Sequence, residues 1–409
     1  MPADILKFEK RPKPKPEPEV AARQAKTSGG GRFEALDVLR GLFMCGMLLA
    51  NNAGDWGHIY TQMDHADWHG FTLTDMVFPG FMTVVGISMT LSLGRRMADG
   101  GKTAMIVHIA RRAAILVGIG LFLNLLPDFD LAHWRFPGVL QRTGICYFLA
   151  SMLMLLHSHV SKDGKLVIHP LPLALWASGL ILAYALLLRF VPVPGFPLVQ
   201  GAAPLQNFGS VASWPAYVDR IVFTTNHVWQ QALTDGKITY DPEGLLSTFP
   251  AIFNILAGLL IGLYIKDKTP KGAWVGVMML GIVLMIAGVG LDPQVPIIKK
   301  LWTSSFALLT SGFAMFVLSL LMVVMDQIGW RAWAFPLRVF GTNAILAYVA
   351  AWVLAVLFDV AGISGRVTHW LSSVIHDPYA MSATYAFGFL VLIWLLLLPF
   401  YLKRWFIKV

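Results

Sequence analysis

The sequence predicts an all-α integral membrane protein with about ten transmembrane helices. Hydrophobic residues make up 56% of the chain, charged residues only 13%, and the mean hydropathy is +0.63. Soluble domains carry about 25% charged residues, so this composition excludes an ordinary soluble globule. Apolar runs of roughly 18 residues or more can cross a membrane as helices, and none of those found here alternates like a barrel strand. They lie near residues 36–54, 72–94, 106–126, 138–157, 171–190, 244–265, 272–290, 301–325, 337–358 and 383–402.

The positions of Lys and Arg predict that both termini are cytoplasmic. With the amino terminus inside, the inner segments hold 23 of these residues and the outer segments hold eight. Positive flanks remain inside during membrane insertion, so this count fixes the expected orientation. The net charge of +9 then reflects inward-facing flanks, and we expect no binding of nucleic acid.

We expect two regions, a disordered cytoplasmic tail at 1–32 and a transmembrane domain at 33–409. The tail contains PKPKPEPE and a run of glycines, a composition that cannot bury a core. Within the domain, residues 191–240 form a long external loop rich in Pro, Gly and aromatic residues. A loop of that length is either functional or poorly ordered. The two cysteines lie in separate apolar runs, so neither a disulfide framework nor a metal site is expected.

A polar loop between the first two apolar runs is the candidate active site. Polar groups are costly beside lipid unless they serve a purpose. Asp75 lies one turn inside the second run and needs a partner such as a histidine, an arginine or a helix amino terminus. The loop concentrates carboxylate, amide and imidazole groups, namely Asn51, Asn52, Asp55, His58, Asp64, His65, Asp67 and His69.

Two basic features on the inner side each have a structural and a functional interpretation. Arg40 shares a helix face with Asp37 and Asn51, which fits a helix-end ion pair as well as a functional surface. The segment 95–112 is either an ordinary positive-inside loop with a Gly-Gly hinge or a grip for phosphate groups. Its arginines are Arg95, Arg96, Arg111 and Arg112.

Polar residues on the outer side are also open to two interpretations. Arg142 falls in the first turn of the fourth apolar run, where it either forms a buried ion pair or contacts the substrate. Asp241 is expected to cap the sixth helix, with Glu243 in its first turn. Lys299 and Lys300 precede the eighth helix, and Asn343 lies in the ninth. Inward polar groups of this kind suit an enzyme cavity and equally a transporter.

The ordered set of motifs resembles the heparan-α-glucosaminide N-acetyltransferase family, part of a broader group of transmembrane acyltransferases. The resemblance rests on motifs that run from residue 33 through most of the chain. They are LDVLRG at 36–41, Asn51, HADWHGFTLTDMVFPGF at 65–81, GVLQRTG at 138–144, YDPEG at 240–244, KKLWTSS at 299–305 and GTNAILAY at 341–348.

This resemblance implies transfer of an acetyl group from cytoplasmic acetyl-CoA to the amino group of a glucosamine-type sugar on the external side, without a metal. The family's essential histidine falls on His65 and its membrane asparagine on Asn51. Imidazole can act as a general base or carry the acetyl group, Asp75 or Asp67 can orient it, and Asn51 can donate to an oxyanion. The expected acetyl-CoA contacts are Arg40, Arg95, Arg96, Arg111 and Arg112. Acceptor contacts are expected from Asp67, Trp68, Arg142, Glu243, Lys299 and Trp302.

The resemblance further implies a multi-pass protein of a bacterial inner membrane that forms a homodimer in the lipid bilayer. Two alternatives remain open at this stage. One is a transporter of sugars or peptidoglycan fragments, and the other is an O-acetyltransferase of a surface glycan.

Overall fold

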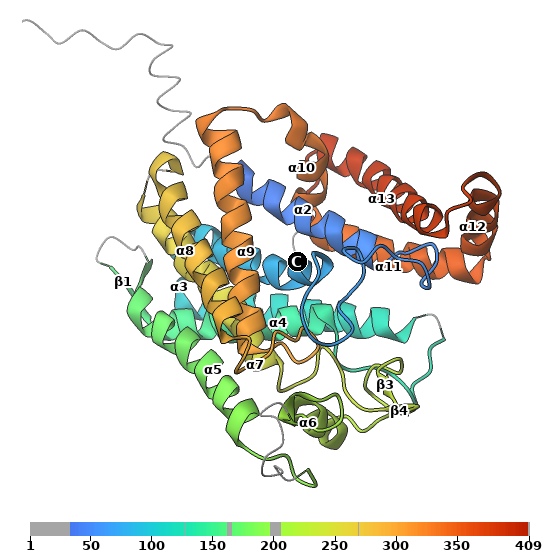
Figure 1. Cartoon of the computed structure of the whole chain (residues 1–409). Coiled ribbons are helices and arrows are strands. Elements are labelled where there is room, and N and C mark those ends of the chain that lie inside the picture. Colours follow the sequence, from blue (N-terminus) through green and yellow to red (C-terminus); the bar gives the residue numbers. More distant parts are fainter. Residues whose placement is uncertain (1–32, 127, 162–165, 197–205, 269, 408–409) are drawn as a thin grey trace, which may run out of the picture. The chain divides into compact units, whose positions relative to one another are not determined.

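The computed structural model describes residues 33–126, 128–161, 166–196, 206–268 and 270–407, with the backbone alone for 92–100, 206, 270 and 271. By its internal contacts, Ala35–Val409 forms one unit. Helices dominate this unit, and the described part contains only two short hairpins of strand (Figure 1). The hairpins pair β1 (Ser158–Val160) with β2 (Leu166–Ile168) and β3 (Leu233–Thr234) with β4 (Lys237–Ile238), both antiparallel. The predicted all-α membrane class is confirmed.

The helices follow the predicted apolar runs closely. Among the described residues, eight are long and apolar enough to span a membrane, and a bent pair makes a ninth. The first predicted run forms α2, whose 17 residues are too few for it to be counted among these spans. The bounds in chain order are α2 (Glu34–Ala50), η1 (Thr74–Met76), α3 (Val77–Leu125), α4 (Val139–Leu156), α5 (Pro170–Phe190), η2 (Gln206–Phe208), α6 (Trp214–Val222), α7 (Thr248–Asp267), α8 (Pro270–Leu291), α9 (Ser304–Met322), η3 (Val323–Gln327), η4 (Ala332–Ala334), α10 (Phe335–Thr342), α11 (Ala344–Val360), α12 (Ile363–Val374) and α13 (Pro378–Leu402).

The predicted inner loop at 95–112 is helical on both sides of a kink at Gly101, within the expected Gly-Gly hinge, so the second and third runs are two helices that meet there under one label, α3. Its only non-helical residue is Gly101, with φ 74° and ψ −178°. That conformation is open to glycine because it has no Cβ. A straight helix of 49 residues would be about 74 Å long, more than twice the hydrocarbon thickness. The break at Gly101 therefore allows α3 to supply two spans, Thr74–Leu91 and Gly101–Leu125.

The ninth predicted helix is broken in two at Asn343. Helices α10 and α11 meet there with a bend of 73°. The Asn343 side chain donates to the carbonyl of Trp405 at 3.2 Å and accepts from the Ile407 N–H at 3.0 Å. Hydropathy cannot show this break, because it depends on the hydrogen bonds that Asn343 makes with the end of the chain.

Helix α7 lies at the centre of the packing, and α8 lies at its edge. In α7, 78% of the membrane-spanning segment is buried inside the protein, against 17% in α8. Helix α7 crosses α3 through glycines: a Cβ on Gly86 would lie 2.0 Å from the Ile255 carbonyl oxygen, and one on Gly258 would lie 2.0 Å from that of Thr83. Small residues permit this close approach of two backbones in a membrane.

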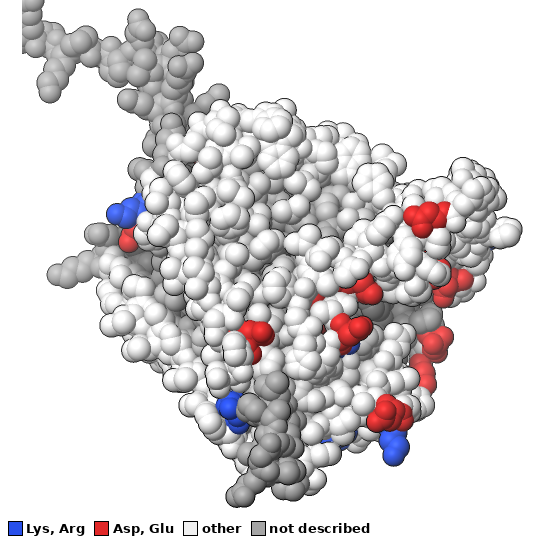
Figure 2. All heavy atoms as spheres, viewed as in Figure 1, with Lys and Arg blue, Asp and Glu red and all other residues white. Residues whose placement is uncertain are grey.

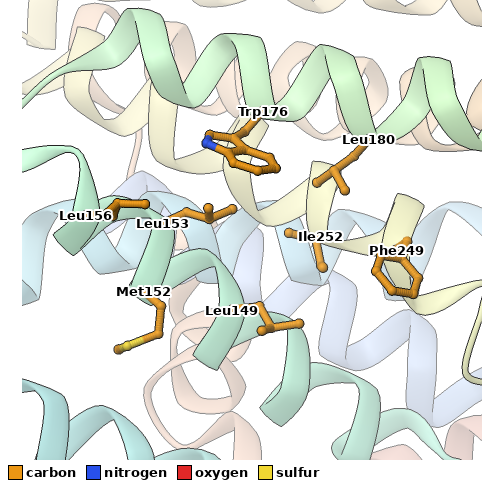
Figure 3. A pocket seen from close by; sticks show the side chains of 8 residues that line it. All are labelled: Leu149, Met152, Leu153, Leu156, Trp176, Leu180, Phe249 and Ile252. Atoms are coloured by element: carbon orange, nitrogen blue, oxygen red, sulfur yellow. The ribbon is translucent and has the colours of Figure 1, made fainter.

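An apolar pocket of about 420 Å3 lies between α4, α5 and α7 (Figure 3). None of the predicted site residues lines it. Its lining comes from Leu149, Met152, Leu153, Leu156, Trp176, Leu180, Phe249 and Ile252. The polar chemistry of the protein is therefore found elsewhere, at the end of the bundle where the loop after α2 lies.

Candidate active site

The loop at 51–73 is held against the segment that precedes α9. The Gly70 N–H donates to the carbonyl of Ile297 at 2.9 Å, and Lys300 Nζ donates to the carbonyl of Asp67 at 2.7 Å. Gly70 has φ +87°, where a residue without a Cβ is favoured. These bonds bring two segments that are far apart in the sequence to one place.

Asp75 and His65 form the central pair of the site. Nδ1 of His65 lies 2.8 Å from Oδ1 of Asp75. The Asp75 side chain is fully buried, whereas the His65 side chain is 39% exposed. The pair therefore has one end fixed inside the protein and one end open to a substrate.

The second oxygen of Asp75 accepts two further hydrogen bonds from the loop. The donors are the N–H of Ala66 at 3.1 Å and the N–H of Thr72 at 2.9 Å, while the Thr72 hydroxyl donates to the carbonyl of Asp64 at 2.6 Å. Hydrogen bonds to a buried carboxylate stabilise its charged form. A charged Asp75 accepts the Nδ1–H of His65, which leaves Nε2 with its lone pair.

Lys299 completes the arrangement from the segment before α9. Its Nζ lies 2.7 Å from Nδ1 and 2.9 Å from Nε2 of His65, and 3.4 Å from Oδ1 of Asp75. Because Nδ1 already faces Asp75, Nε2 is the partner for a hydrogen bond from Lys299. Burial lowers the pKa of Lys299, although the nearby charge of Asp75 acts in the opposite direction. A carboxylate, an imidazole and an amine thus meet at one point.

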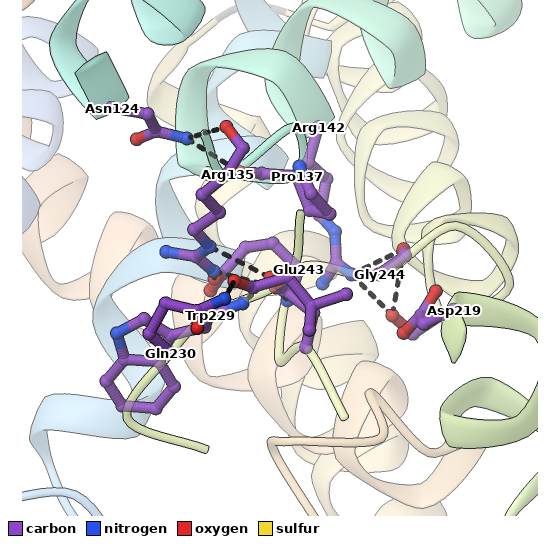
Figure 4. A network of polar contacts seen from close by, with 12 residues as sticks. Asn124, Arg135, Pro137, Arg142, Asp219, Trp229, Gln230, Glu243 and Gly244 are labelled. Atoms are coloured by element: carbon purple, nitrogen blue, oxygen red, sulfur yellow. Dashed lines mark hydrogen bonds and ion pairs between the residues drawn. The ribbon is translucent and has the colours of Figure 1, made fainter. Parts of the chain in front are cut away.

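A second network surrounds Arg135, which precedes α4 (Figure 4). Its Nε and Nη2 donate to the two oxygens of Asp241 at 2.8 and 2.7 Å, and Nη2 also bonds Glu243. Trp229 donates its backbone N–H to Asp241 at 2.9 Å. Burial alone would lower the pKa of Arg135, but the charges of Asp241 and Glu243 raise it.

The expected cap at Asp241 is therefore wrong. Helix α7 begins at Thr248, with Ser247 as the residue before it. Asp241 instead closes a turn, since its Oδ1 accepts the N–H of Glu243 at 2.8 Å. The paired charges of Arg135 hold the DPEG sequence in this turn, so the helix starts later than its sequence signals indicate.

Arg142 and Asp219 hold the same turn from its other side. Nη2 of Arg142 donates to the carbonyl of Gly244 at 3.1 Å and to the Ser247 hydroxyl. Asp219 accepts the N–H of Leu245 at 2.8 Å. Both side chains are buried, and among the described residues Arg142 Nε and Nη1 and Asp219 Oδ2 have no hydrogen-bond partner. Burial raises the pKa of Asp219 to about 7.

Two predicted acceptor contacts, Trp68 and Trp302, differ in accessibility. Trp68 is half-buried and donates Nε1–H to the carbonyl of Phe208 at 2.7 Å. Trp302 is fully buried beneath the guanidinium of Arg142, with 4.7 Å between Cζ and the ring centroid, and donates to Asn254 at 2.9 Å. A fully buried ring offers no surface to a substrate in this conformation, whereas Asp67 is exposed.

Comparison with known proteins relates this sequence to a family. A family model described as heparan-alpha-glucosaminide N-acetyltransferase, catalytic, matches residues 32–196, which include His65 and Asp75. The chain is 31% identical over 355 residues to the human heparan-alpha-glucosaminide N-acetyltransferase, covering 78% of this chain and 52% of that protein. It is 29% identical over 367 residues to the mouse protein, covering 81% and 55% respectively.

The chain belongs to the heparan-alpha-glucosaminide N-acetyltransferase family. It spans about half the length of the curated relatives that it matches. The predicted family resemblance is confirmed by these matches.

The asparagine expected from the family motif, Asn51, lies just after α2 and is exposed. Its backbone N–H donates to the carbonyl of Met47 at 3.1 Å, and the described part of the chain shows no hydrogen bond of its side chain to His65. The adjacent Asn52 is buried and donates to the carbonyl of Leu48 at 2.7 Å. A role for Asn51 at an oxyanion stays a prediction.

The arginines that are predicted to bind acetyl-CoA lie in three different environments. Arg40 bonds Asp37 at 3.0 Å, the Gly341 carbonyl at 3.0 Å and the Ser88 hydroxyl at 2.6 Å. Arg111 is exposed, and Arg112 lies over the Tyr147 ring at 4.8 Å, with a buried Nε that lacks a partner among the described residues. The side chains of Arg95 and Arg96 lie outside the described residues.

The sequence does not reveal three residues of the network around the YDPEG turn. In the sequence Arg135 is one of the eight outer Lys and Arg residues, Asp241 reads as a helix cap, and Asp219 carries no signal. The HWRFPG stretch before α4 carried a signal for Arg135, because an arginine beside a predicted span needs a partner. Nothing local to Asp219 indicates burial.

Proposed function

We propose that this protein is a membrane-embedded acetyltransferase that transfers the acetyl group of acetyl-CoA to the amino group of a glucosamine-type sugar. The observation that carries the proposal is the contact of His65 with Asp75 and Lys299, within a chain of this family. Such a set can remove a proton from a nucleophile and stabilise negative charge.

In the proposed reaction, a C–N bond forms between the acetyl carbonyl carbon and the sugar nitrogen, and the C–S bond of the thioester breaks. Nε2 of His65 takes the proton that the amine loses, while Asp75 holds Nδ1–H and stabilises the imidazolium. For Nε2 to be available, the ammonium of Lys299 turns from Nε2 toward the carbonyl oxygen, where negative charge grows. The thiolate leaving group takes up the proton.

The donor enters, in this proposal, from the side of the membrane that carries most of the Lys and Arg residues. Its phosphate groups need cations, and Arg111 is exposed on α3. Arg112 supplies an unused buried Nε–H on the same helix. The positive-inside rule makes this side cytoplasmic and leaves His65 on the external side. The membrane in this proposal is a bacterial inner membrane.

The test uses purified protein in detergent or nanodiscs with acetyl-CoA and glucosamine, with mass spectrometry of the sugar. We expect an acetyl group on nitrogen that survives mild base, whereas an ester product would point to O-acetylation. His65→Ala should abolish turnover, and His69→Ala, which alters an exposed histidine of the same loop, should not. Uptake of unmodified sugar by proteoliposomes without acetyl-CoA would overturn the proposal in favour of transport.

A further inference from the structure

The loops around His65 carry an excess of exposed acidic side chains. We call these loops the His65 side, comprising residues 51–73, 128–138, 191–247, 292–303 and 359–377. Hydrogen bonds tie them together, for example Gly70 to Ile297 and Arg135 to Asp241. Its exposed carboxylates are Asp64, Asp67, Asp128, Asp130, Asp235, Asp292, Asp359 and Asp377.

Few positive charges balance these carboxylates on the surface. The exposed Lys and Arg residues of the described part of the His65 side are Lys237 and Arg366. The stretch 197–205, which is not described, contains no charged residue. Figure 2 shows the red acidic side chains spread over the region where Figure 1 places the loop after α2, the β3–β4 hairpin and the turn between α11 and α12.

Most basic side chains here serve the fold and are not presented to a ligand. Arg366 donates to the carbonyls of Gly362 and Ala361, and Arg220 donates to those of Thr239 and Val211. Hydrogen bonds within the protein also hold Arg135, Arg142, Lys299 and Lys300. The described residues of the His65 side therefore present no exposed cluster of arginine or lysine, the side chains that favour binding of sulfate groups.

The His65 side also carries an exposed group of aromatic rings bordered by carboxylates. Tyr60 and Tyr379 are 45% and 40% exposed, with ring centroids 5.6 Å apart. The Tyr60 hydroxyl lies 3.5 Å from Asp377 Oδ2, and His58, in contact with Tyr379, bonds Asp55 at 2.7 Å. Aromatic faces pack against the apolar faces of sugar rings, and carboxylates bind ammonium groups.

We infer that the acceptor of this protein is a cationic, unsulfated oligosaccharide of glucosamine, drawn to the His65 side by its carboxylates and packed against Tyr60 and Tyr379. This inference rests on the proposed acetyltransferase function and names its substrate class. The protonated fraction of its amines is cationic, so the acidic surface raises the local concentration of this form. The same carboxylates repel the negative charges of a sulfated glycan.

The test compares three oligosaccharides of equal length at pH 7: a glucosamine trimer, a trimer with one terminal glucosamine on N-acetylated units, and the O-sulfated form of the second. We expect kcat/KM to fall in that order. Raising the salt concentration should lower kcat/KM for the cationic trimer and raise it for the sulfated one, because salt screens both the attraction and the repulsion.

Two sets of variants test which side chains of the His65 side favour the cationic trimer. The triple variant Asp128→Asn, Asp130→Asn, Asp235→Asn should reduce kcat/KM for the cationic trimer by about 3- to 10-fold with kcat unchanged. Asp267→Asn, at the opposite end of α7, is the matched control and should have no effect. Tyr60→Ser with Tyr379→Ser should raise KM for the trimer more than for free glucosamine.

The outcomes separate this inference from the function on which it rests. If none of the acceptors is acetylated, the proposed function fails. If all three are acetylated with similar kcat/KM that salt does not change, or if the sulfated trimer is preferred, the function stands and the cationic acceptor is wrong.

Discussion

Asp75 Oδ1 lies 2.8 Å from Nδ1 of His65, and the carboxylate that makes this contact is fully buried. The buried partner fixes the tautomer and the orientation of a ring that is itself accessible. Such a pair connects the packing of the helix bundle directly to the chemistry at its surface.

Asp75→Asn should lower kcat by about 10²- to 10⁴-fold with little change in KM for the sugar, because an amide can present its N–H to Nδ1 and favour the wrong tautomer. Steady-state kinetics measure this split. Asp64→Asn is the control, since its carboxylate accepts a backbone N–H of the loop and does not touch the imidazole ring. Equal losses in the two variants would contradict an orienting role for Asp75.

Lys299→Met should lower kcat by about 10²-fold through loss of positive charge at the carbonyl oxygen. In the unmodified protein, burial lowers the pKa of Lys299, so activity should decline on the alkaline side below the ordinary lysine value of 10.5. A pH–rate profile of Lys299→Met should lack this decline. Lys300→Met should retain it, and a wild-type profile that stays flat up to the ordinary lysine value would refute the assignment.

Asp219 should make the protein less stable as pH rises from about 4 to about 7. Burial raises its pKa from 3.8 to about 7, so between these values the folded state keeps a proton that the unfolded state has lost. Folding therefore becomes less favourable with each step toward neutral pH. Thermal unfolding of Asp219→Asn should show a weaker pH dependence, and Asp235→Asn, at an exposed position, should behave like the unmodified protein.

Gly86→Ala and Gly258→Ala should each destabilise the bundle by about 1–3 kcal/mol, because the added methyl group would meet a backbone carbonyl at 2.0 Å. Thermal unfolding in detergent measures the loss. Gly179→Ala and Gly290→Ala are matched controls on other helices, since a Cβ there meets nothing within 4 Å. If all four variants unfold alike, the close crossing of α3 and α7 is not what holds these helices together.

Much of the fold could be predicted, because burial in lipid requires long apolar helices whatever their partners. Runs such as 171–190 and 272–290 reappear as α5 and α8 within a residue or two. The Gly-Gly hinge expected in 95–112 reappears as the kink at Gly101, although the residues around it are helical. The errors fall at Asn343 and Asp241, where an amide bonded to the end of the chain and a buried charge network override the local pattern.

The candidate site was predicted in part. His65 and Asp75 stand ten residues apart, and both attract notice as polar groups beside lipid. Asp75 was expected to need a partner, and the structure supplies His65 and Lys299. The ion pair of Arg40 with Asp37, one of the two interpretations of that face, is confirmed. The accessibility of Trp302 and the further bonds of Arg40 to Gly341 and Ser88 could not be predicted, because they depend on which neighbours surround the side chain.

The sequence by itself determined the membrane class, the approximate spans and the polar loop that carries His65, since these follow from composition and from the cost of placing polar groups in lipid. Only the tertiary structure decided that Lys299, 234 residues away, contacts the His65 ring, and that Arg135 and Arg142 are used in holding the YDPEG turn. The reason is physical: hydropathy acts on each segment alone, whereas a hydrogen bond or an ion pair exists only when packing brings two distant segments within about 3 Å.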